Sequence, residues 1–343
     1  MTQTLRHISP VPSPVRVEAP ARLHLGFLDP SASLGRHFAS LGLVIDGLGT
    51  VVDVLPSSMN EVSLDGPADE AVASRLRWQL ARLQGETGAG HPVRVVLRRA
   101  PLAHCGLGSG TQLALALGRA FARSHGIALD SRQIAQMLGR GERSGIGIAG
   151  FDHGGLLLDG GPGAGRQPAP LLARATFPEA WRVVLVLDQA MHGLHGSEER
   201  QAMASLPPFA EERAAAMCHQ VLMRVLPAAL EADFQPFADG VTAIQRQIGD
   251  YFADAQGGSM FTSERVGRAV EWLGERHRAG IGQSSWGPTG FAIFPSEQAA
   301  RSAVGAATEA GVIGGRLKVE IVSGRNSGGR TVVGKDAMGP LAG

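Results

Sequence analysis

A glycine-rich loop that runs directly into an amphipathic helix constrains the fold of this chain more than any other feature. Residues 106–111 read GLGSGT, and Leu113, Leu117 and Phe121 then recur at every fourth position. That spacing is typical of a helix with one buried stripe. Glycine lets backbone N–H groups approach an oxyanion without an intervening Cβ, and the helix that follows adds its own free N–H groups.

The pattern therefore favours a phosphate-binding loop over the alternative, a tight turn that joins a strand to a core helix. The residues predicted to bind phosphate are Gly106, Leu107, Gly108, Ser109, Gly110 and Thr111.

Two common phosphate motifs do not fit this loop. The dinucleotide-binding fingerprint would require glycine at position 111, where threonine stands. The P-loop would require a lysine a few residues further on, and the only lysines of the chain are Lys318 and Lys335. Any cationic group that binds an anion here is therefore expected to be an arginine, whose guanidinium can bind an oxyanion through two parallel hydrogen bonds.

Composition places the chain among globular enzymes. Its 343 residues, 44% hydrophobic, suffice for one large or two medium domains. The net charge of +1 gives no broad basic surface for nucleic acid. Two cysteines cannot form a disulfide framework or a metal cluster, and no apolar run is long enough to span a membrane. The first residues do not resemble a signal peptide. We therefore expect a soluble, cytoplasmic protein.

A strand is predicted for residues 15–29, in which Leu23, Leu25 and Phe27 alternate with polar residues or glycine. Side chains two positions apart share one face of a strand. Arg22 and His24 are therefore expected on the face opposite the core.

Strand and helix patterns of both kinds recur along the chain and predict an α+β fold with two domains. A glycine-rich loop at 159–170 and a buried strand at 180–188 suggest a boundary near residue 185. The predicted organisation has four parts: a flexible arm at 1–14, an N-terminal domain at 15–185, a C-terminal domain at 186–330 and a tail at 331–343.

The loop and three further segments resemble a known family. The segment P-x-x-x-x-G-L-G-S-G-T, which starts at Pro101, is similar to the second motif of the GHMP kinase superfamily, P-x-x-x-G-L-G-S-S-A, which wraps the phosphates of ATP. It differs by one extra residue and by Gly110 and Thr111 in place of the Ser-Ala pair. The segments ARLHLGFLDPSASLGRHFASLGLVID, GERSGIGIAGFDHGGLLLDGG and GQSSWGPTGFAIFP resemble the β-ribofuranosylaminobenzene 5′-phosphate synthase family.

That family belongs to the GHMP superfamily by fold but does not consist of kinases. The resemblance covers about residues 18–330. It implies a ribosomal-S5-like N-terminal domain and a ferredoxin-like C-terminal domain. The implied reaction joins phosphoribosyl pyrophosphate to 4-aminobenzoate or 4-hydroxybenzoate in methanopterin biosynthesis, with release of carbon dioxide and pyrophosphate.

The resemblance also implies Mg²⁺ as cofactor, small-molecule substrates and a homodimer. The alternative function is an ATP-dependent small-molecule kinase of the same superfamily, and a third is a non-catalytic ligand sensor.

The resemblance assigns candidate residues to the site. Ser109 would supply the hydroxyl nearest the metal. A carboxylate beside the oxocarbenium-like centre would come from Asp29 or Asp152, although Asp29 also suits a turn before Pro30.

Other candidates would contact the substrates. An arginine would bind the benzoate carboxylate or a phosphate oxygen, with Arg22 favoured over Arg36 and Arg143, and His24 would share the face of Arg22. The remaining substrate-binding candidates, from the second and third of the three segments, are Ser144, Ser284, Ser285 and Trp286. Trp286 is expected either to stack on the aromatic acid or to lie in the core.

Overall fold

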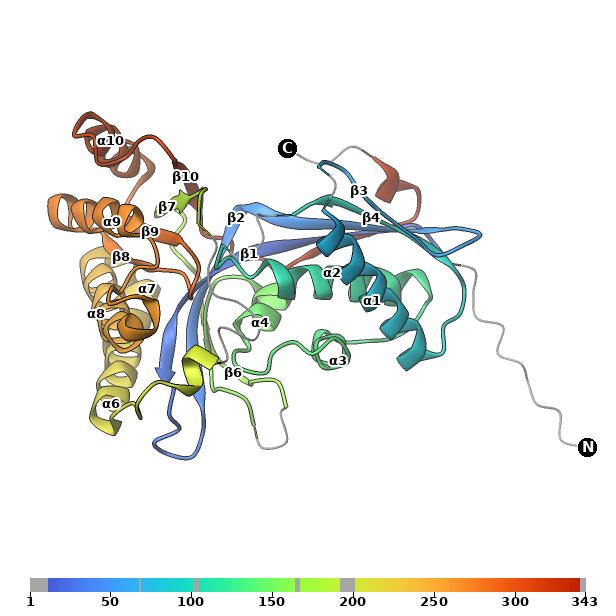
Figure 1. Ribbon diagram of the computed structural model, residues 1–343, viewed down its shortest axis with the longest axis horizontal. Helices are drawn as coiled ribbons and strands as arrows, with labels where there is room; N and C mark the ends of the chain where they lie inside the picture. The colour runs from blue at the N-terminus through green and yellow to red at the C-terminus, as the bar shows by residue number, and fades with distance from the viewer. Residues whose placement is uncertain (1–11, 68, 101–104, 164–166, 192–200, 340–343) are drawn as a thin grey trace, which may run out of the picture.

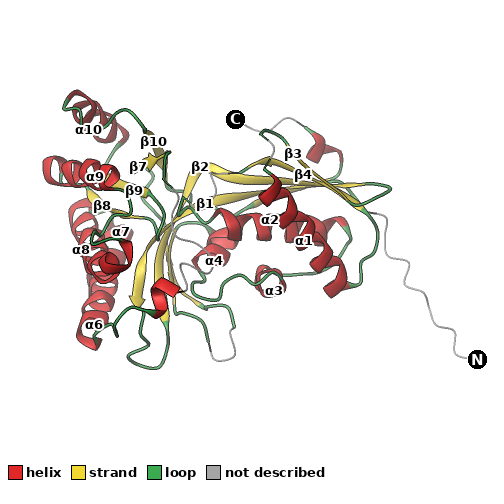
Figure 2. Ribbon diagram, in the orientation of Figure 1, coloured by secondary structure: helices red, strands yellow, loops and turns green. Residues whose placement is uncertain are grey.

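Two β-sheets, each covered by helices, form the two halves of the molecule (Figure 1). The structure is a computed structural model, and it describes residues 12–67, 69–100, 105–163, 167–191 and 201–339. Figure 2 shows helices in both halves and the long strands β1 (Val15–Asp29) and β2 (Phe38–Pro56) that run from one half toward the other. The α+β fold class predicted from the sequence is confirmed.

The sheet of the N-terminal half has the order β11-β1-β2-β4-β3, and β5 and β6 extend it from β2. Its other strands are β3 (Glu61–Leu64), β4 (Val93–Arg99), β5 (Leu156–Asp159), β6 (Leu171–Ala175) and β11 (Arg330–Val333). The pairings are antiparallel except for β3 with β4. Helix α1 (Glu70–Thr87) connects these two parallel strands, as a parallel pair requires a crossover.

Helices cover one face of this sheet (Figure 1). Besides α1 they are α2 (Ser109–Ser124), α3 (Ser131–Met137) and α4 (Ile146–His153). The stripe of Leu113, Leu117 and Phe121 on α2 is buried in a cluster that includes side chains of α1, α3 and the sheet. The predicted helix after the glycine loop is therefore confirmed, and its burial fixes the position of the loop.

The C-terminal half has the strand order β10-β7-β9-β8, all antiparallel. The strands are β7 (Arg182–Asp188), β8 (Gly280–Gln283), β9 (Thr289–Phe294) and β10 (Leu317–Ser323). Numbered within this half, the order is 4-1-3-2, and helices separate the first strand from the second and the third from the fourth. This is the ferredoxin-like arrangement.

The helices of the C-terminal half are α6 (Glu211–Gln220), α7 (Leu226–Glu231), α8 (Phe234–Phe252), α9 (Glu264–His277) and α10 (Glu297–Glu309). A π-helical turn η1 (Val221–Val225) joins α6 to α7, and two 3₁₀ turns are η2 (Ala253–Gln256) and η3 (Lys335–Met338). No helix within the described part of the chain is both long and apolar enough to cross a membrane.

Two of the expected domain boundaries fall inside strands of the structure. The boundary expected at residue 185 falls inside β7, and all of β7 belongs to the second sheet. The tail expected from residue 331 begins inside β11, which returns to pair with β1. Residues 1–11 of the expected arm lie outside the described residues, while Ser13 exchanges hydrogen bonds with Ser124 at the end of α2.

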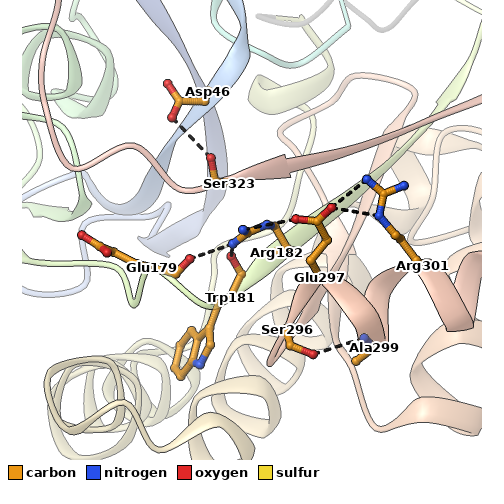
Figure 3. A network of polar contacts seen from close by, with 9 residues as sticks. All are labelled: Asp46, Glu179, Trp181, Arg182, Ser296, Glu297, Ala299, Arg301 and Ser323. Atoms are coloured by element: carbon orange, nitrogen blue, oxygen red, sulfur yellow. Dashed lines mark hydrogen bonds and ion pairs between the residues drawn. The ribbon is translucent and has the colours of Figure 1, made fainter.

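A shared core and a polar network hold the halves together. Leu23 and Leu25 of β1 belong to one buried cluster with Phe237 and Ile244 of α8. Figure 3 shows polar contacts around the second sheet, including the bond from the Ser323 hydroxyl to an Asp46 carboxylate oxygen at 3.3 Å. The Ser323–Asp46 bond joins β10 to β2, and with the shared core it holds β1 and β2 against the second domain.

The alternation of β1 holds for Leu23 and Leu25, which are fully buried, but not for Phe27. The pairing of β1 with β2 shifts between His24 and Gly26, where Gly26 has φ 129°. Leu28 is consequently buried in place of Phe27. The Phe27 ring lies instead against the His24 ring, with centroids 4.5 Å apart. The prediction for Phe27 was wrong because a bulge interrupts the period of two.

Candidate active site

The glycine loop forms the start of α2, as the sequence predicts. Gly108 caps the helix with φ 78°, and its carbonyl oxygen accepts bonds from the N–H groups of Thr111 and Gln112 at 3.0 and 3.1 Å. No side chain of the described residues forms a cap hydrogen bond at this helix start. The positive end of α2 thus has no side-chain acceptor and suits an anion.

Arg22 lies against this loop. Its Nη1 donates to the Gly106 carbonyl oxygen at 2.7 Å, and its backbone N–H donates to the Leu107 carbonyl oxygen at 3.2 Å. A Cβ placed on Gly108 would lie 3.0 Å from the Arg22 Cζ atom. The structure therefore brings Arg22 of β1 to the phosphate-binding candidates. Glycine is favoured at 108 because its φ of 78° is strained for other residues, and a Cβ there would also crowd the guanidinium.

Two further arginines, which the sequence did not indicate, flank the same helix start. A Cβ placed on Gly110 would lie 3.8 Å from Nη1 of both Arg75 and Arg140. Arg75 belongs to α1 and Arg140 to the connection between α3 and α4. Among the described residues, no carboxylate forms an ion pair with either. Burial, followed by the nearby charge of Arg75, lowers the pKa of Arg140.

The third family-like segment reaches the loop from the second domain. The Ser284 hydroxyl donates to the Gly106 carbonyl oxygen at 2.8 Å and accepts from the His24 backbone N–H at 3.0 Å. A Cβ on Gly106 would overlap the Ser284 carbonyl oxygen. Ser284 therefore joins β1, the glycine loop and the second domain at one point. Its neighbour Ser285 has φ 57°, a left-handed backbone that few residues other than glycine adopt.

His24 and Trp286 are both deeply buried at this junction, each with 4% of its surface exposed. Burial, together with the charges of Arg22 and then Arg143, lowers the pKa of His24 to about 3. The imidazole is therefore neutral at physiological pH. Trp286 packs edge-on against Phe252 with ring centroids 4.9 Å apart. Its indole lies in the core cluster that the two domains share, which was one of its two expected positions.

The two carboxylate candidates have partners of their own. The Asp29 carboxylate accepts bonds from the N–H and hydroxyl of Ser33 at 2.8 Å and from the Ser31 N–H at 3.2 Å, which matches the turn alternative. Asp152 on α4 accepts from the Ser131 hydroxyl at 2.5 Å and lies 3.6 Å from Arg119. Asp152 is thus turned toward α2 and α3, and no described contact joins it to the glycine loop.

The remaining candidates surround a carboxylate that the sequence did not indicate, Asp159. This fully buried group accepts bonds from the Ser144 hydroxyl at 3.0 Å and from the N–H groups of Ser40, Gly145 and Gly161. Burial outweighs these bonds and raises the pKa of Asp159. It fixes the turn before α4.

The two remaining arginine candidates have different neighbours, and only Arg36 contacts the turn that follows Asp159. The Arg36 side chain donates to the Gly160 and Gly161 carbonyl oxygens. Arg143 bonds to the Met203 sulfur at 3.1 Å and acts electrostatically on His24.

The donor set for a metal is small. Within the described residues there is no group of three or more His, Cys, Asp or Glu side chains that could hold a metal ion. Ser109 offers one hydroxyl at the start of α2. Mg²⁺ usually keeps several waters and binds through substrate phosphates as well as protein carboxylates. The residues fit a magnesium ion that is carried mainly by a diphosphate, and do not fit one held by the protein alone.

Comparison with known proteins agrees with this geometry. Residues 74–155 match the GHMP kinases N terminal domain, and residues 225–313 match GHMP kinases C terminal. The fold resembles mevalonate diphosphate decarboxylase from Staphylococcus aureus, with a TM-score of 0.67 and 10% identity over 93% of this chain and 98% of that chain. It also resembles homoserine kinase from Cytophaga hutchinsonii, with a TM-score of 0.60 and 18% identity over 95% of this chain and 99% of that chain.

Closer relatives carry one shared name. The chain is 34% identical to β-ribofuranosylphenol 5′-phosphate synthase of Archaeoglobus fulgidus over 82% of this chain and 88% of that protein. It is 28% identical to the protein of the same name from Methanothermobacter thermautotrophicus over 91% of this chain and 97% of that protein. With this identity over most of both chains, the protein belongs to the β-ribofuranosylphenol 5′-phosphate synthase family and has the two-domain GHMP fold.

Proposed function

We propose that the protein is a decarboxylating phosphoribosyltransferase that joins phosphoribosyl pyrophosphate to a 4-substituted benzoate. The product would be a β-ribofuranosylbenzene 5′-phosphate of methanopterin biosynthesis, in keeping with the name of its relatives. The enzyme would act in the cytoplasm on these small molecules, as a homodimer.

The observation that carries the proposal is the set of three guanidinium groups around the start of α2. Arg22, Arg75 and Arg140 come from three separate parts of the fold and flank Gly108 and Gly110. Phosphoribosyl pyrophosphate carries a diphosphate and a monophosphate, and both are strong ligands for guanidinium groups and helix N-termini. The leaving diphosphate gains negative charge as its bond to the ribose breaks, so these groups would stabilise the transition state more than the bound substrate.

In the proposed reaction the bond from ribose C1 to the diphosphate oxygen breaks, and the ring carbon that carries the carboxylate attacks C1. The bond from that ring carbon to the carboxylate then breaks, carbon dioxide leaves, and the electron pair returns to the ring. No proton is taken up or released in this balance. Arg22 lies between the loop and His24, where it can hold the benzoate carboxylate or a ribose phosphate oxygen.

Magnesium enters the proposal as part of the substrate. The diphosphate would bring the ion, and the Ser109 hydroxyl at the start of α2 would be its protein ligand. When bound, the ion would neutralise charge on the leaving diphosphate. Asp29 stays a proposed stabiliser of the positive centre on the ribose, although its present bonds to Ser31 and Ser33 hold it in a turn.

The kinase alternative is supported less well. An ATP-dependent kinase of this superfamily needs a base that takes the proton of an acceptor hydroxyl. The candidate from the matching segment, Asp152, is engaged with Ser131 and Arg119 on the side of α3. Nothing in the described contacts turns it toward the glycine loop.

The test is incubation of the purified protein with phosphoribosyl pyrophosphate, Mg²⁺ and carboxyl-labelled 4-hydroxybenzoate or 4-aminobenzoate. We expect labelled carbon dioxide and pyrophosphate in equal amounts, with no consumption of added ATP. Phosphorylation of an alcohol by ATP, without turnover of phosphoribosyl pyrophosphate, would instead establish the kinase.

A further inference from the structure

A groove on the second domain lies between α9 and the turn that joins α10 to β10. It has a volume of about 520 Å³, whereas one water occupies about 30 Å³. One wall is α9, and the other is uncharged and consists of Gly311, Val312, Gly314 and Leu317. Helix α9 lies at the edge of the molecule away from α2 (Figure 1), so the groove is separate from the candidate active site.

The α9 wall of the groove carries a patterned set of charges. Its side chains are Arg265, Arg268, Glu271, Trp272 and Glu275. Their spacings of three and four residues place them along one face of the helix. The two arginines stand toward the start of α9 and the two glutamates toward its end.

This order of charges runs against the dipole of the helix. The N-terminal end of a helix favours negative side chains, and the C-terminal end favours positive ones. Outside the groove α9 follows this rule, with Glu264 in its first turn and Arg276 and His277 in its last. Inside the groove the order is reversed. Neighbours of like charge three or four residues apart destabilise an isolated helix further, so this face is electrostatically unfavourable in a single chain.

The chain itself does not compensate these charges. Across the residues that the structure describes, none of the four charged side chains of the α9 wall forms an ion pair or a side-chain hydrogen bond. All four are exposed. Trp272 beside them is half-buried against the core of this domain, and the Arg276 guanidinium lies 5.7 Å from its ring centroid. The Trp272 ring therefore already holds one cation.

We propose that this groove is the dimer interface of the protein, where α9 of one subunit packs antiparallel against α9 of a second copy. The charge pattern is self-complementary, because a two-fold axis brings the arginine end of one helix to the glutamate end of the other. In such a contact each residue pair forms twice. The two helix dipoles also run in opposite directions. The inference rests on the homodimer of the proposed function and specifies its surface.

The sequence positions fix the register of the two helices. Arg265 and Glu275 lie five positions on either side of Val270. Arg268 and Trp272 lie two positions on either side of the same residue. A two-fold axis at the level of Val270 therefore places Arg265 opposite the partner's Glu275, and it also places Arg268 opposite the partner's Trp272. The first contact is an ion pair and the second a cation–π contact.

The test is the mass of the full chain in solution, measured by analytical ultracentrifugation over a range of protein concentrations. For the native protein we expect a dimer. Its dissociation constant should rise between about 0.1 M and about 1 M salt, because salt screens exposed ion pairs. Arg265→Glu and Glu275→Arg each replace two symmetry-related ion pairs by two like-charge contacts. Each variant should dimerise about a hundredfold more weakly, about tenfold for each contact.

A mixture of the two variants separates this arrangement from any other. In the mixed dimer the introduced glutamate of Arg265→Glu faces the introduced arginine of Glu275→Arg, and the second contact is the native ion pair. Both contacts are attractive, so the mixture should dimerise as tightly as the native protein. Arg123→Glu, at the end of α2, changes the net charge as Arg265→Glu does and is the matched control. It should leave the native dimer unchanged.

Three results would overturn the inference. They are a native monomer at every concentration, a native dimer that salt does not weaken, and single variants that dimerise as tightly as the native protein. A mixture that stays as weak as its two components would overturn the antiparallel register and with it the interface.

The mass is measured without substrate, so this test is independent of the chemistry. Absence of turnover of phosphoribosyl pyrophosphate would overturn the proposed reaction and leave the interface standing. A native monomer that turns over phosphoribosyl pyrophosphate would overturn the interface and leave the reaction standing.

Discussion

Two arginine clusters of the N-terminal domain differ in what balances their charge. In the first, the fully buried Asp53 carboxylate accepts from Arg16 at 2.7 and 2.8 Å and from Arg98 at 2.8 Å. Arg98 also reaches Asp65 at 2.7 Å. The bond to Asp53 raises the pKa of Arg16. Each arginine of this cluster is paired with a carboxylate of the same chain, so the cluster stabilises the fold.

The second cluster, around the start of α2, has cations without a described carboxylate partner at Arg75 and Arg140. Burial and mutual repulsion lower the pKa of Arg140, the opposite direction to Arg16. The charge of Glu142 offsets this effect only in part, and a bound anion would offset it further. The arginines of the first cluster are paired within the chain, whereas Arg75 and Arg140 form no ion pair with a described carboxylate, and this difference supports the start of α2 as the proposed substrate site.

The largest effect is expected from breaking the balanced cluster. Asp53→Ala leaves Arg16 buried without its carboxylate, and the loss of one partner of a buried pair typically costs about 3–5 kcal/mol. We expect the free energy of unfolding to fall by about that amount, measured by urea denaturation. The exposed pair of Arg77 and Glu70 is the control, and Glu70→Ala should have a far smaller effect. Equal effects of both variants would contradict the comparison.

The next effect concerns the unbalanced cluster. Arg140→Ala removes one of two neighbouring like charges, so the free energy of unfolding should stay the same or rise. The value of kcat/KM for phosphoribosyl pyrophosphate should fall, because the bound diphosphate loses a charged partner. The fall should correspond to a rise of about 2–5 kcal/mol in activation free energy. Arg123→Ala removes the same charge from the opposite end of α2 and should leave kcat/KM unchanged. A destabilised Arg140 variant with normal kinetics would make Arg140 a structural residue.

The third prediction concerns His24, a buried base that the fold keeps neutral, and its effect grows as the pH falls. The folded protein holds the pKa of His24 at about 3, below the ordinary value of 6.5. Between these values the unfolded chain binds a proton that the folded protein does not, so this contribution to stability is present above pH 6.5 and is lost as the pH falls. It should lower the free energy of unfolding by about 1.4 kcal/mol per pH unit.

His24→Gln should remove that contribution. The measurement is urea denaturation of both proteins at several pH values from 7 to 4. Parallel stability curves for the variant and the native protein would show that His24 takes up its proton in the folded state as readily as in the unfolded chain.

Features that depend on neighbouring residues could be predicted well. The helix of Leu113, Leu117 and Phe121, and the burial of Leu23 and Leu25, follow from the spacing of apolar side chains. The family followed from short motifs that keep their order along the chain. The contact of Arg22 with the glycine loop agrees with the expected face of β1, although its role in catalysis stays a prediction.

Features that depend on topology could not be predicted. The bulge between His24 and Gly26 leaves no recognisable pattern in the sequence, so Phe27 was predicted on the wrong face of β1. Asp159 lies in a family-like segment, but nothing in that segment marks it as a buried acceptor. Arg75 and Arg140 belong to none of the family-like segments, and nothing in their local sequence separates them from surface charges. The strand β11 pairs with β1 although almost the whole chain lies between them.

The sequence by itself therefore determined the α+β class, the buried stripe of α2, the burial of Leu23 and Leu25, and the family to which the chain belongs. These properties follow from side-chain spacing and from short motifs, and both are local. The tertiary structure alone decided which charged groups meet. Arg22, Arg75 and Arg140 come from β1, α1 and the α3–α4 connection, which are distant in sequence, and they meet at the start of α2 through the packing of the fold. It also decided which arginines pair with carboxylates, as Arg16 does with Asp53, and which lie at the start of α2 without an ion pair to a described carboxylate, as Arg75 and Arg140 do.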